Sequence, residues 1–496
     1  MMRALVAFLF LIFASSVVWI AAQAYDAAQE RQKTYRYIAN ALTPMAARQS
    51  HVTWEAPLKP LIRPFTEYDA EAVGLAMGEA WQVLAIAQDT GNAELIADKF
   101  TGVAQERVLL SISDAVSFGG RMTVLAQTAR PIFFHKDGSM FQAEVEMTVT
   151  RYLPATDGSE GVFQITKDTG IATLMNESNG WRIYSYELRS STPITVGPAL
   201  WSGRLNGINY YPAETPWRDF WAEFDEAEIA RDFEAIAGLG ANAVRFFLTR
   251  DTFVGDDSEA SVAKLERFLE LAGVHELRVV PTLFDLKQDF GLGSWADDAL
   301  YLERVMPVLA RSNAVAFVDL KNEPDLDFAH HGQARMMAWL QSMIVLSRVE
   351  APDLALTIGW SDAAYASLLA QDLDVVTYHD YAALEGTEGR LKSVRSEVGK
   401  KPVLITEIGE SSYEVGFSFP GSDQKQAERL GDRLKHLNSA DGTFVWTLHD
   451  FPKVDPTVVG RSPWVKRLQG AFGLIGPDGD EKPSAAFVRA HFLASD

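Results

Sequence analysis

The feature that most constrains the fold is a regular alternation of apolar runs and amphipathic stretches from about Pro198 to the C-terminus. Such alternation of strand and helix signals predicts a parallel sheet, because parallel strands need crossover connections. The predicted strands are 205–211, 243–248, 278–285, 315–323, 355–360, 374–381, 402–408 and 443–448. Eight repeats fit a closed (β/α)8 barrel better than an open doubly wound sheet. No Gly-x-Gly-x-x-Gly pattern follows the first strand, so a dinucleotide-binding fold has no support.

Two of these predicted strands end in a single carboxylate. The fourth ends at Pro324, which cannot donate to a strand ladder, and this leaves Asn322 and Glu323 at its tip. The seventh ends in Glu407, and Gly409 breaks the strand behind it. In a parallel barrel the C-terminal ends of the strands form the rim where chemistry takes place.

The fourth and seventh strands of an eight-stranded barrel face each other across its mouth. The sequence therefore predicts that Glu323 and Glu407 meet over a common cleft. Two facing carboxyl groups are what glycoside cleavage requires, because one protonates the leaving oxygen and the other meets the positive charge that develops at the anomeric carbon. The alternative for either residue alone is a solvated carboxylate at a strand end.

The barrel resembles the retaining glycoside hydrolases of clan A, and is most similar to glycoside hydrolase family 5. The resemblance covers the whole of residues 198–496 and falls at the strand ends in chain order. One position departs from the family pattern, since Phe284-Asp285 stands where the family often has a histidine. The motifs that carry the resemblance are 207–212, 240–245, 322–324, 378–381, 406–409, 444–448 and 473–483.

This resemblance implies an enzyme that hydrolyses O-glycosyl bonds by double displacement. It makes Glu323 the general acid and then the general base, and Glu407 the nucleophile. We expect an apolar pocket and the charge of Glu407 to hold up the pKa of Glu323. Arg245 is expected to lie beside Glu407 and to favour its ionised form.

The remaining predicted site residues bind substrate. Asn322 is expected to reach the sugar 2-hydroxyl, and His379 to orient Glu323 or bind a hydroxyl. Tyr381, or its neighbour Tyr378, is expected to hydrogen-bond Glu407. Two aromatic residues complete the predicted site, with Trp446 as the platform under the sugar ring and Tyr210 as a subsite wall.

Residues 66–191 have a different pattern and predict a small α+β domain. Two helical stretches, 68–88 and 93–100, precede strands at 122–126, 132–135, 141–152, 161–164 and 181–188. Hairpin signals at Asp137-Gly138 and Asn179-Gly180 favour an antiparallel sheet. The order resembles the cone-like fold of nuclear transport factor 2. We expect a spacer or docking role, with a partner from polysaccharide synthesis or export as a hypothesis.

The N-terminus predicts a location outside the cytoplasm. Arg3 precedes an apolar run over residues 4–22, which is long enough to span a bilayer, within a segment 1–24. An anchor is favoured over a signal peptide cleaved near Ala24, where small residues flank Gln23. Residues 25–65 are expected to form a juxtamembrane helix and a linker. Both alternatives suggest an exported or cell-surface glycan as substrate.

Charge and composition exclude some classes of molecule as partners of the 496-residue chain. A net charge of -21 argues against nucleic acid, because there is no basic surface to displace counterions. Cysteine is absent, which excludes disulfides and thiolate chemistry, and no metal or cofactor is expected. The expected substrate is a β-linked polysaccharide or oligosaccharide. A transglycosylase with the same residues, and a non-catalytic glycan-binding or scaffold protein, stay open as alternatives.

Overall fold

The computed structural model describes residues 52–114, 117, 120–153, 162–177, 180–255, 257–414 and 421–494. The predicted spanning segment 4–22, the cleavage position near Ala24 and most of the segment 25–65 lie outside these residues. Within the described ranges, no helix is both long enough and apolar enough to cross a bilayer. The predicted anchor therefore stays a prediction.

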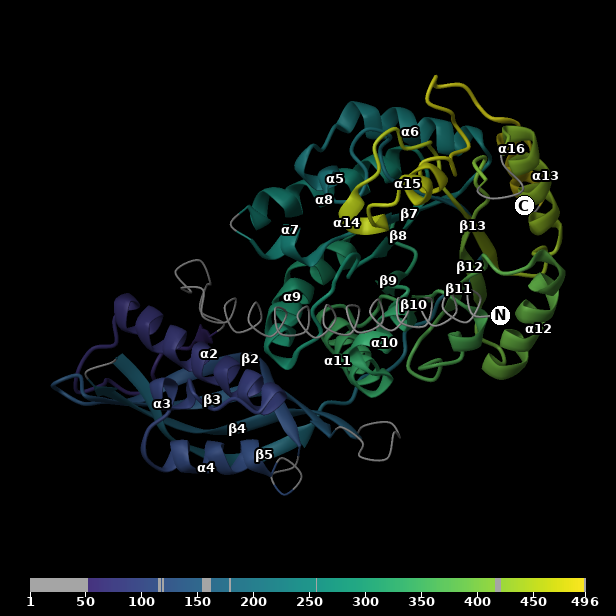
Figure 1. Ribbon diagram of the computed structural model, residues 1–496. Coiled ribbons are helices and arrows are strands. Elements are labelled where there is room, and N and C mark those ends of the chain that lie inside the picture. The colour runs from purple at the N-terminus through teal and green to yellow at the C-terminus, as the bar shows by residue number, and fades with distance from the viewer. Residues whose placement is uncertain are drawn as a thin grey trace, which may run out of the picture. The chain divides into compact units, whose positions relative to one another are not determined.

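The described part of residues 52–193 contains a short strand, three helices and four long strands, and the five strands form one sheet in sequence order (Figure 1). Thr66 begins the first long helix with a capping box, in which its hydroxyl accepts from the Asp69 amide and the Asp69 carboxylate accepts from the Thr66 amide. The elements are β1 (Val52–Trp54), α2 (Glu67–Thr90), α3 (Ile96–Lys99), α4 (Gly102–Ser113), β2 (Arg121–Phe134), β3 (Met140–Leu153), β4 (Val162–Glu177) and β5 (Gly180–Pro193). The predicted strands 122–126 and 132–135 are thus one strand, which passes through Pro131.

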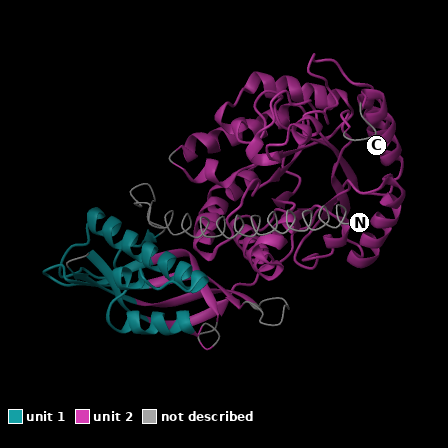
Figure 2. Ribbon diagram, in the orientation of Figure 1, with its two compact units in different colours: residues 1–113, 129–144, 172–186 teal, residues 114–128, 145–171, 187–496 magenta. Residues whose placement is uncertain are grey.

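The chain divides into two compact units (Figure 2). One comprises residues up to 113 with 129–144 and 172–186, and the other comprises 114–128, 145–171 and 187–496. Within the first unit, aromatic rings pack against one another. Phe65 stacks on Phe141 at 4.9 Å, and Trp81 lies edge-on to Tyr186 at 5.6 Å. The predicted boundaries at 66 and 191, and the likeness to nuclear transport factor 2, stay predictions.

The second unit contains a closed barrel of eight parallel strands, as the alternation predicted (Figure 1). The strands pair in the order β10-β11-β12-β13-β6-β7-β8-β9, and β13 closes the barrel on β6 through the register Gly442–Leu205 to Trp446–Asn209. The strands are β6 (Leu205–Asn209), β7 (Ala243–Phe247), β8 (Arg278–Thr282), β9 (Val318–Asn322), β10 (Leu356–Trp360), β11 (Val376–His379), β12 (Val403–Ile408) and β13 (Gly442–Trp446).

Helices cover the outside of the barrel (Figure 1). Polar residues begin several of them, as where the Asp225 carboxylate accepts from the amides of Ala227 and Glu228. The long helices are α6 (Glu226–Gly238), α8 (Ser258–Val274), α9 (Trp295–Arg311), α11 (Gln333–Glu350), α12 (Thr387–Val398), α13 (Asp423–Lys435) and α16 (Pro483–Leu493). Short helices are α5 (Asp219–Ala222), α7 (Arg250–Val254), α10 (Phe328–His331), α14 (Pro456–Val459) and α15 (Pro463–Gln469).

One end of the barrel interior is apolar and the other is polar. A buried cluster fills the region near the N-terminal ends of the strands, and it comprises Leu205, Ala243, Val280, Ala316, Phe317, Ala355, Val375, Leu404 and Phe444 with Ala199. On β7 to β12, a polar side chain follows two residues further along the chain, at Arg245, Thr282, Asp319, Thr357, Thr377 and Thr406. Apolar side chains therefore fill the N-terminal end of the barrel, and a polar site can form only at the C-terminal rim.

The fourth barrel strand ends as Pro324 predicted. β9 stops at Asn322, and Glu323 adopts a left-handed conformation with φ 47° and ψ 53°. A short 3-10 helix, η3 (Pro324–Asp327), follows. The amide of Glu323 still donates to the carbonyl of Gly359 at 2.8 Å. This bond anchors the backbone of Glu323 to the neighbouring strand while its side chain turns over the rim.

Candidate active site

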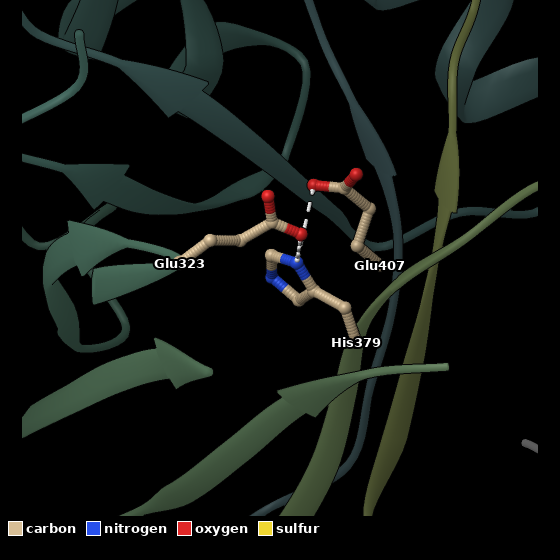
Figure 3. Close-up of side chains that lie close together, drawn as sticks. All are labelled: Glu323, His379 and Glu407. Carbon is tan, nitrogen blue, oxygen red and sulfur yellow. Dashed lines mark hydrogen bonds and ion pairs between the residues drawn. The ribbon is translucent and has the colours of Figure 1, made fainter. Parts of the chain in front are cut away.

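The two predicted carboxylates point toward each other over the barrel mouth (Figure 3). Glu323, Glu407 and His379 each contribute one atom to a group in which all atoms lie within 4.8 Å of one another. Glu407 is nearly buried, with 11% of its side chain exposed, whereas Glu323 is 24% exposed. A carboxyl separation of roughly 5–5.5 Å is that of retaining glycosidases, and the inverting arrangement needs about 6.5–9.5 Å.

Arg245, at the centre of β7, is fully buried beneath the two carboxylates. Its Nη1 donates to Glu407 Oε2 at 3.1 Å and to Asn209 Oδ1 at 2.8 Å. Its Nη2 donates to Asn322 Oδ1 at 2.8 Å. Burial acts to lower the pKa of Arg245, but the charges of Asp319 and Glu407 outweigh it and raise the pKa. The guanidinium is therefore a permanent cation, and it fixes Asn322 as well as Glu407.

His379, the last residue of β11, and Tyr381, just after it, each contact a carboxylate. The Tyr381 hydroxyl donates to Glu407 Oε1 at 2.8 Å, which settles the choice between Tyr378 and Tyr381. His379 Nδ1 lies 2.8 Å from Glu323 Oε1 and 3.7 Å from Glu407 Oε2. Each oxygen of Glu407 thus accepts one hydrogen bond, while His379 aligns Glu323.

The environment of Glu407 disfavours its charge. Burial raises its pKa, and the nearby charge of Glu323 adds to the effect. His379, Arg245 and the hydroxyl of Tyr381 act in the opposite direction without cancelling it. Glu407 is therefore a carboxylate with an incompletely stabilised charge.

The pKa of Glu323 moves in the opposite direction from the one we expected. Burial would raise it, but the hydrogen bond and the charge of His379, with Arg245 and Lys321, outweigh burial and lower it. The expectation of a raised pKa is therefore wrong for the unliganded site. The physical reason is the imidazole, which lies closer to Glu323 than to Glu407 and favours the negative charge there.

Trp446 lies at the end of β13 with 9% of its surface exposed. Its ring meets Phe247 edge-on at 5.9 Å and Tyr211 edge-on at 6.3 Å. The guanidinium of Arg245 lies over the Phe247 ring at 4.7 Å, so this aromatic group borders the charged one. The predicted sugar platform is therefore linked through Phe247 to Arg245, which binds Glu407.

Tyr210 is not brought to this site. It is fully buried, and its hydroxyl donates to Asp232 Oδ2, on α6, at 2.8 Å. The rings of Phe220 and Phe233 pack edge-on against it. The side chain that turns toward Trp446 is the next one, Tyr211. Both residues follow the last ladder position of β6, Asn209, so regular strand alternation did not decide which of them would face the site.

Three site residues were missed from the sequence. Asp319 and Asn209 bind Arg245, and Tyr211 donates to Asp285 Oδ2 at 2.8 Å. A signal for Asp319 was present, because Asp319 and Lys321 alternate with the apolar Val318 and Leu320 along one strand, four and two residues before Glu323. A charged residue facing the inside of a barrel needs a partner there.

An open cleft of about 650 Å³ begins at Tyr381. Its lining includes Phe472 as well as charged residues on the loops after β11 and β12. Arg433 joins these loops, since it donates to Asp380 Oδ1 at 3.2 Å and to Glu410 Oε1 at 3.0 Å. The cleft thus combines aromatic and paired charged groups beside Tyr381, which donates to Glu407.

Glu323, His379 and Glu407 could also serve as the ligands of a divalent cation. However, both oxygens of Glu407 already accept hydrogen bonds, from Arg245 and from Tyr381. The permanent charge of Arg245 would oppose a cation at this point. The arrangement fits a pair of carboxyls that handle protons better than it fits a metal centre.

The buried charge of Glu407 leads to a prediction about stability. Its folded-state pKa lies above its unfolded value, so its contribution to stability is fully present below the unfolded pKa and is lost as pH rises through the folded pKa. We expect Glu407→Gln to raise the melting temperature at neutral pH by about 1–3 °C, and the gain to shrink as pH falls. Melting curves across pH measure this.

The control for this prediction is Glu388→Gln on α12. Glu388 is fully exposed, and its hydrogen bond to Lys392 lowers its pKa, so removing its charge should give no gain at neutral pH. A melting temperature of Glu407→Gln that is lower than that of the wild type, or a gain independent of pH, contradicts the electrostatic account.

Solved structures of other proteins are similar in fold to this chain. No model of a protein family matches this sequence, and no curated protein does. Among solved structures, a GH5_18 protein from Streptomyces cattleya, crystallised in complex with GlcNAc, is similar with a TM-score of 0.50. The sequence identity is 18%, and the match covers 60% of this chain and 81% of that chain.

Two further solved structures cover a similar share of this chain. The exo-beta-1,4-mannosidase Op5Man5 from Opitutaceae bacterium strain TAV5 has a TM-score of 0.48 and 21% identity, covering 60% of this chain and 62% of its own. A GH5_18 protein from Bifidobacterium longum subsp. infantis has a TM-score of 0.47 and 18% identity, covering 59% and 79%. At 18% identity, the likeness to the Streptomyces cattleya structure shows a shared fold only.

Proposed function

We propose that this protein is a retaining glycoside hydrolase that cleaves β-linked polysaccharides or oligosaccharides by double displacement. The observation that carries the proposal is the pair of carboxyl groups, Glu323 and Glu407, within 4.8 Å at the rim of a (β/α)8 barrel. Their partners differ, since Arg245 and Tyr381 bind Glu407 whereas His379 binds Glu323. This asymmetry suits two roles for two carboxyls.

In the first step, Glu407 attacks the anomeric carbon and the bond to the leaving oxygen breaks. The leaving oxygen takes a proton from the Glu323–His379 pair. His379 Nδ1 lies 2.8 Å from Glu323 Oε1 and orients the Glu323 carboxyl for this transfer. Glu323 passes the proton to the leaving oxygen, although the hydrogen bond and the charge of His379 lower its pKa in the unliganded site.

In the second step, water replaces the leaving group. Because Glu407 is now an ester, its negative charge no longer acts on Glu323, and the carboxylate form of Glu323 is favoured further. Glu323 accepts a proton from the water, whose oxygen attacks the anomeric carbon and releases Glu407. The bond is formed on the same face of the sugar as the one that was broken, so configuration is retained.

The test is a panel of β-glucans, β-mannans and β-linked oligosaccharides that contain GlcNAc. The full chain is incubated with each, and products are read by size and by the anomeric configuration of the sugar first released. Release of the β-anomer by the wild type and not by Glu407→Gln supports the proposal. First release of the α-anomer, or equal release by both proteins, overturns the retaining mechanism assigned to Glu407.

Replacing Tyr381 by phenylalanine tests the hydrogen bond to the nucleophile. A hydrogen bond to a charged group contributes enough for its loss to lower kcat by roughly 10- to 100-fold, with a smaller change in KM. The hydrogen bond from Tyr381 lowers the pKa of Glu407, so its loss should raise that pKa. The acidic limb of the pH–rate profile is therefore expected to move to higher pH.

Tyr378→Phe is the matched control for this variant. Tyr378 is buried on β11, three residues before Tyr381, and its hydroxyl has no hydrogen-bond partner among the described residues. Its removal should leave kcat and the pH profile unchanged. An unshifted acidic limb in Tyr381→Phe would show that the tyrosine does not act on Glu407.

Transglycosylation by the same residues is the second candidate. The cleft of about 650 Å³ beside Tyr381 gives room for an acceptor sugar near Glu407. Products longer than the substrate, formed at high substrate concentration, identify this activity. A non-catalytic glycan-binding role predicts binding without any new reducing end.

We further propose that the barrel acts outside the cytoplasm on an exported or cell-surface glycan. The apolar run over residues 4–22 supports an anchor, and the alternative is secretion after cleavage near Ala24. Residues 66–191 would then dock a partner from polysaccharide synthesis or export. Accessibility of the folded protein to protease outside intact cells, together with the mass of its N-terminal peptide, distinguishes the two alternatives from a cytoplasmic location.

A further inference from the structure

Asp319 is a fully buried carboxylate in the middle of the barrel, four residues before Glu323. It faces the same interior as Glu323, yet the two-step reaction above gives it no role. Both of its oxygens are hydrogen-bonded. Oδ2 accepts from Arg245 Nε at 3.2 Å, from Arg245 Nη2 at 2.8 Å and from Thr282 Oγ1 at 3.1 Å. Oδ1 accepts from the amide of Gly359 at 2.9 Å and from that of Lys321 at 3.3 Å.

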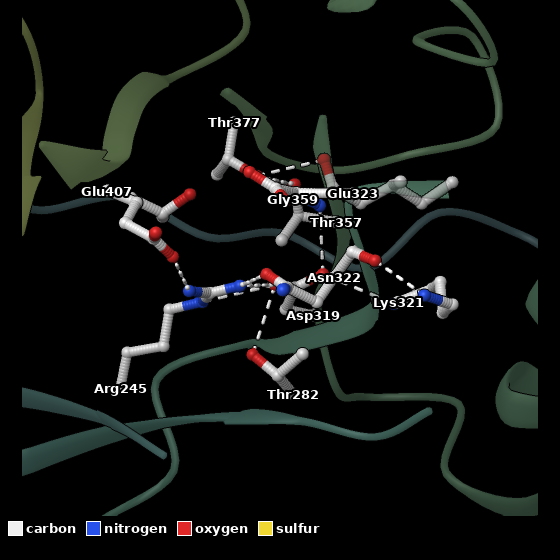
Figure 4. Close-up of polar contacts among 12 residues, drawn as sticks. Arg245, Thr282, Asp319, Lys321, Asn322, Glu323, Thr357, Gly359, Thr377 and Glu407 are labelled. Carbon is white, nitrogen blue, oxygen red and sulfur yellow. Dashed lines mark hydrogen bonds and ion pairs between the residues drawn. The ribbon is translucent and has the colours of Figure 1, made fainter. Parts of the chain in front are cut away.

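The guanidinium of Arg245 is shared unequally between two carboxylates (Figure 4). Two of its nitrogens, Nε and Nη2, contact Asp319, whereas Nη1 alone contacts Glu407, at 3.1 Å. A two-nitrogen contact fixes both the position and the plane of a guanidinium. Asp319 is therefore the principal counter-ion of Arg245, and Glu407 receives a hydrogen bond from only one guanidinium nitrogen.

The position of Asp319 is itself fixed by its surroundings. Gly359 lies against it so closely that a Cβ atom there would be 2.8 Å from Asp319 Oδ2, 3.1 Å from His379 Nε2 and 3.2 Å from Arg245 Nη2. The hydroxyl of Thr282 and the amide of Gly359 hold the carboxylate from two neighbouring strands. The backbones of β8, β9 and β10 thus determine where Arg245 can lie.

We propose that Asp319 is a positioning residue that holds Arg245 so that the nucleophile receives one hydrogen bond from a largely neutralised cation. This inference rests on the proposed function of Glu407 as a nucleophile. A carboxylate that takes the whole charge of an arginine attacks carbon poorly, because its electron pair is already stabilised. Asp319 removes most of that charge while keeping the geometry of the contact.

The proposal predicts the effect of Asp319→Asn on both rate and pH dependence. The amide nitrogen would face the donors of Arg245, so the two-nitrogen contact is lost and Arg245 turns its full charge toward Glu407. A loss of alignment at the reacting atom costs about 10²-fold in kcat. Removing a negative charge beside the carboxyl pair favours ionisation, so its titration midpoint should fall by roughly one pH unit.

The experiment is a titration of the full chain labelled with ¹³C at the glutamate carboxyls. Spectra of Glu323→Gln and Glu407→Gln assign the two signals. Wild type and Asp319→Asn are then titrated without substrate, and kcat and KM are measured on an aryl β-glycoside. The titration needs no turnover, so it tests Asp319 even if the chain proves not to hydrolyse glycosides.

Asp374→Asn is the matched control. Asp374 is also a buried carboxylate that binds an arginine, Arg348, at 2.9 Å, but it precedes β11 at the opposite end of the barrel. This variant should lower thermal stability without moving the midpoint of the Glu323–Glu407 pair. An unchanged midpoint in Asp319→Asn, or an equal shift in Asp374→Asn, overturns the proposal.

Asp319→Glu keeps the proposal testable if the asparagine variant does not fold. The longer side chain retains the charge but displaces the contact with Arg245. We expect kcat to fall while the titration midpoint stays close to that of the wild type. A merely structural role predicts that stability falls and that the kcat of the folded fraction does not, and that result would also overturn the proposal.

Discussion

Replacing Glu407 by alanine is expected to lower kcat by roughly 10⁵-fold or more, because the covalent route loses its nucleophile. The vacated space lies beside Arg245 and Tyr381, which both donate toward it. A small anion such as azide should enter there and attack the anomeric carbon from the same face as Glu407 did. Since only one displacement then takes place, the product should be the α-glycosyl azide, formed from a dinitrophenyl β-glycoside.

Controls for this prediction come from the same rim. Glu410→Ala removes another carboxylate after β12, one that is bound to Arg433, and it should keep most of the activity without forming a glycosyl azide. Glu407→Ala that retains hydrolysis, or that gives the β-glycosyl azide, would refute the assignment of Glu407. Mass spectrometry and the anomeric coupling constant identify the product.

Replacing Glu323 by alanine is expected to give a loss that depends on the leaving group. General acid catalysis contributes roughly 10²–10⁴-fold, so substrates with a poor leaving group should lose that factor in kcat/KM. A dinitrophenyl leaving group needs no proton, and its first step should be nearly unaffected. The second step then becomes slow because the general base is missing, and a burst of dinitrophenol should precede a low steady rate.

Azide distinguishes this variant from the previous one. In Glu323→Ala it should attack the glycosyl-enzyme in place of water and give the β-glycosyl azide, the opposite anomer. His379→Ala is a useful companion, because His379 Nδ1 lies 2.8 Å from Glu323 Oε1 and aligns this carboxyl. We expect it to show the same leaving-group dependence with a smaller loss. An equal loss on all leaving groups in Glu323→Ala would refute its role as the acid.

Much of the barrel was readable from the sequence because each strand is a short buried run between clear breaks. The fourth and seventh strands ended where Pro324 and Gly409 predicted, within a residue or two. Sequence reasoning was weaker for the smaller sheet. It divided β2 at Pro131 and recovered only the first residues of β4, since polar residues alternate there without marking an end.

The direction of side chains beyond the strand ends could not be predicted from the sequence. Tyr210 and Tyr211 are adjacent aromatic residues, and only the fold shows that the first binds Asp232 on α6 while the second turns to Trp446. The same limit applies to His379, whose distance to each carboxylate, 2.8 Å for Glu323 and 3.7 Å for Glu407, determines how strongly it favours the charge of each.

The sequence by itself determined the order of strands and helices and the closed barrel. It also determined the two carboxylates, each at the C-terminal end of its strand, on strands that face each other across the barrel. It did so because period, strand breaks and chain order are local properties. Only the tertiary structure decided how charge is distributed, since that depends on distances between residues far apart in the chain. Arg245, for instance, contacts Asp319 through two nitrogens and Glu407 through one, across three strands, and no sequence pattern specifies that division.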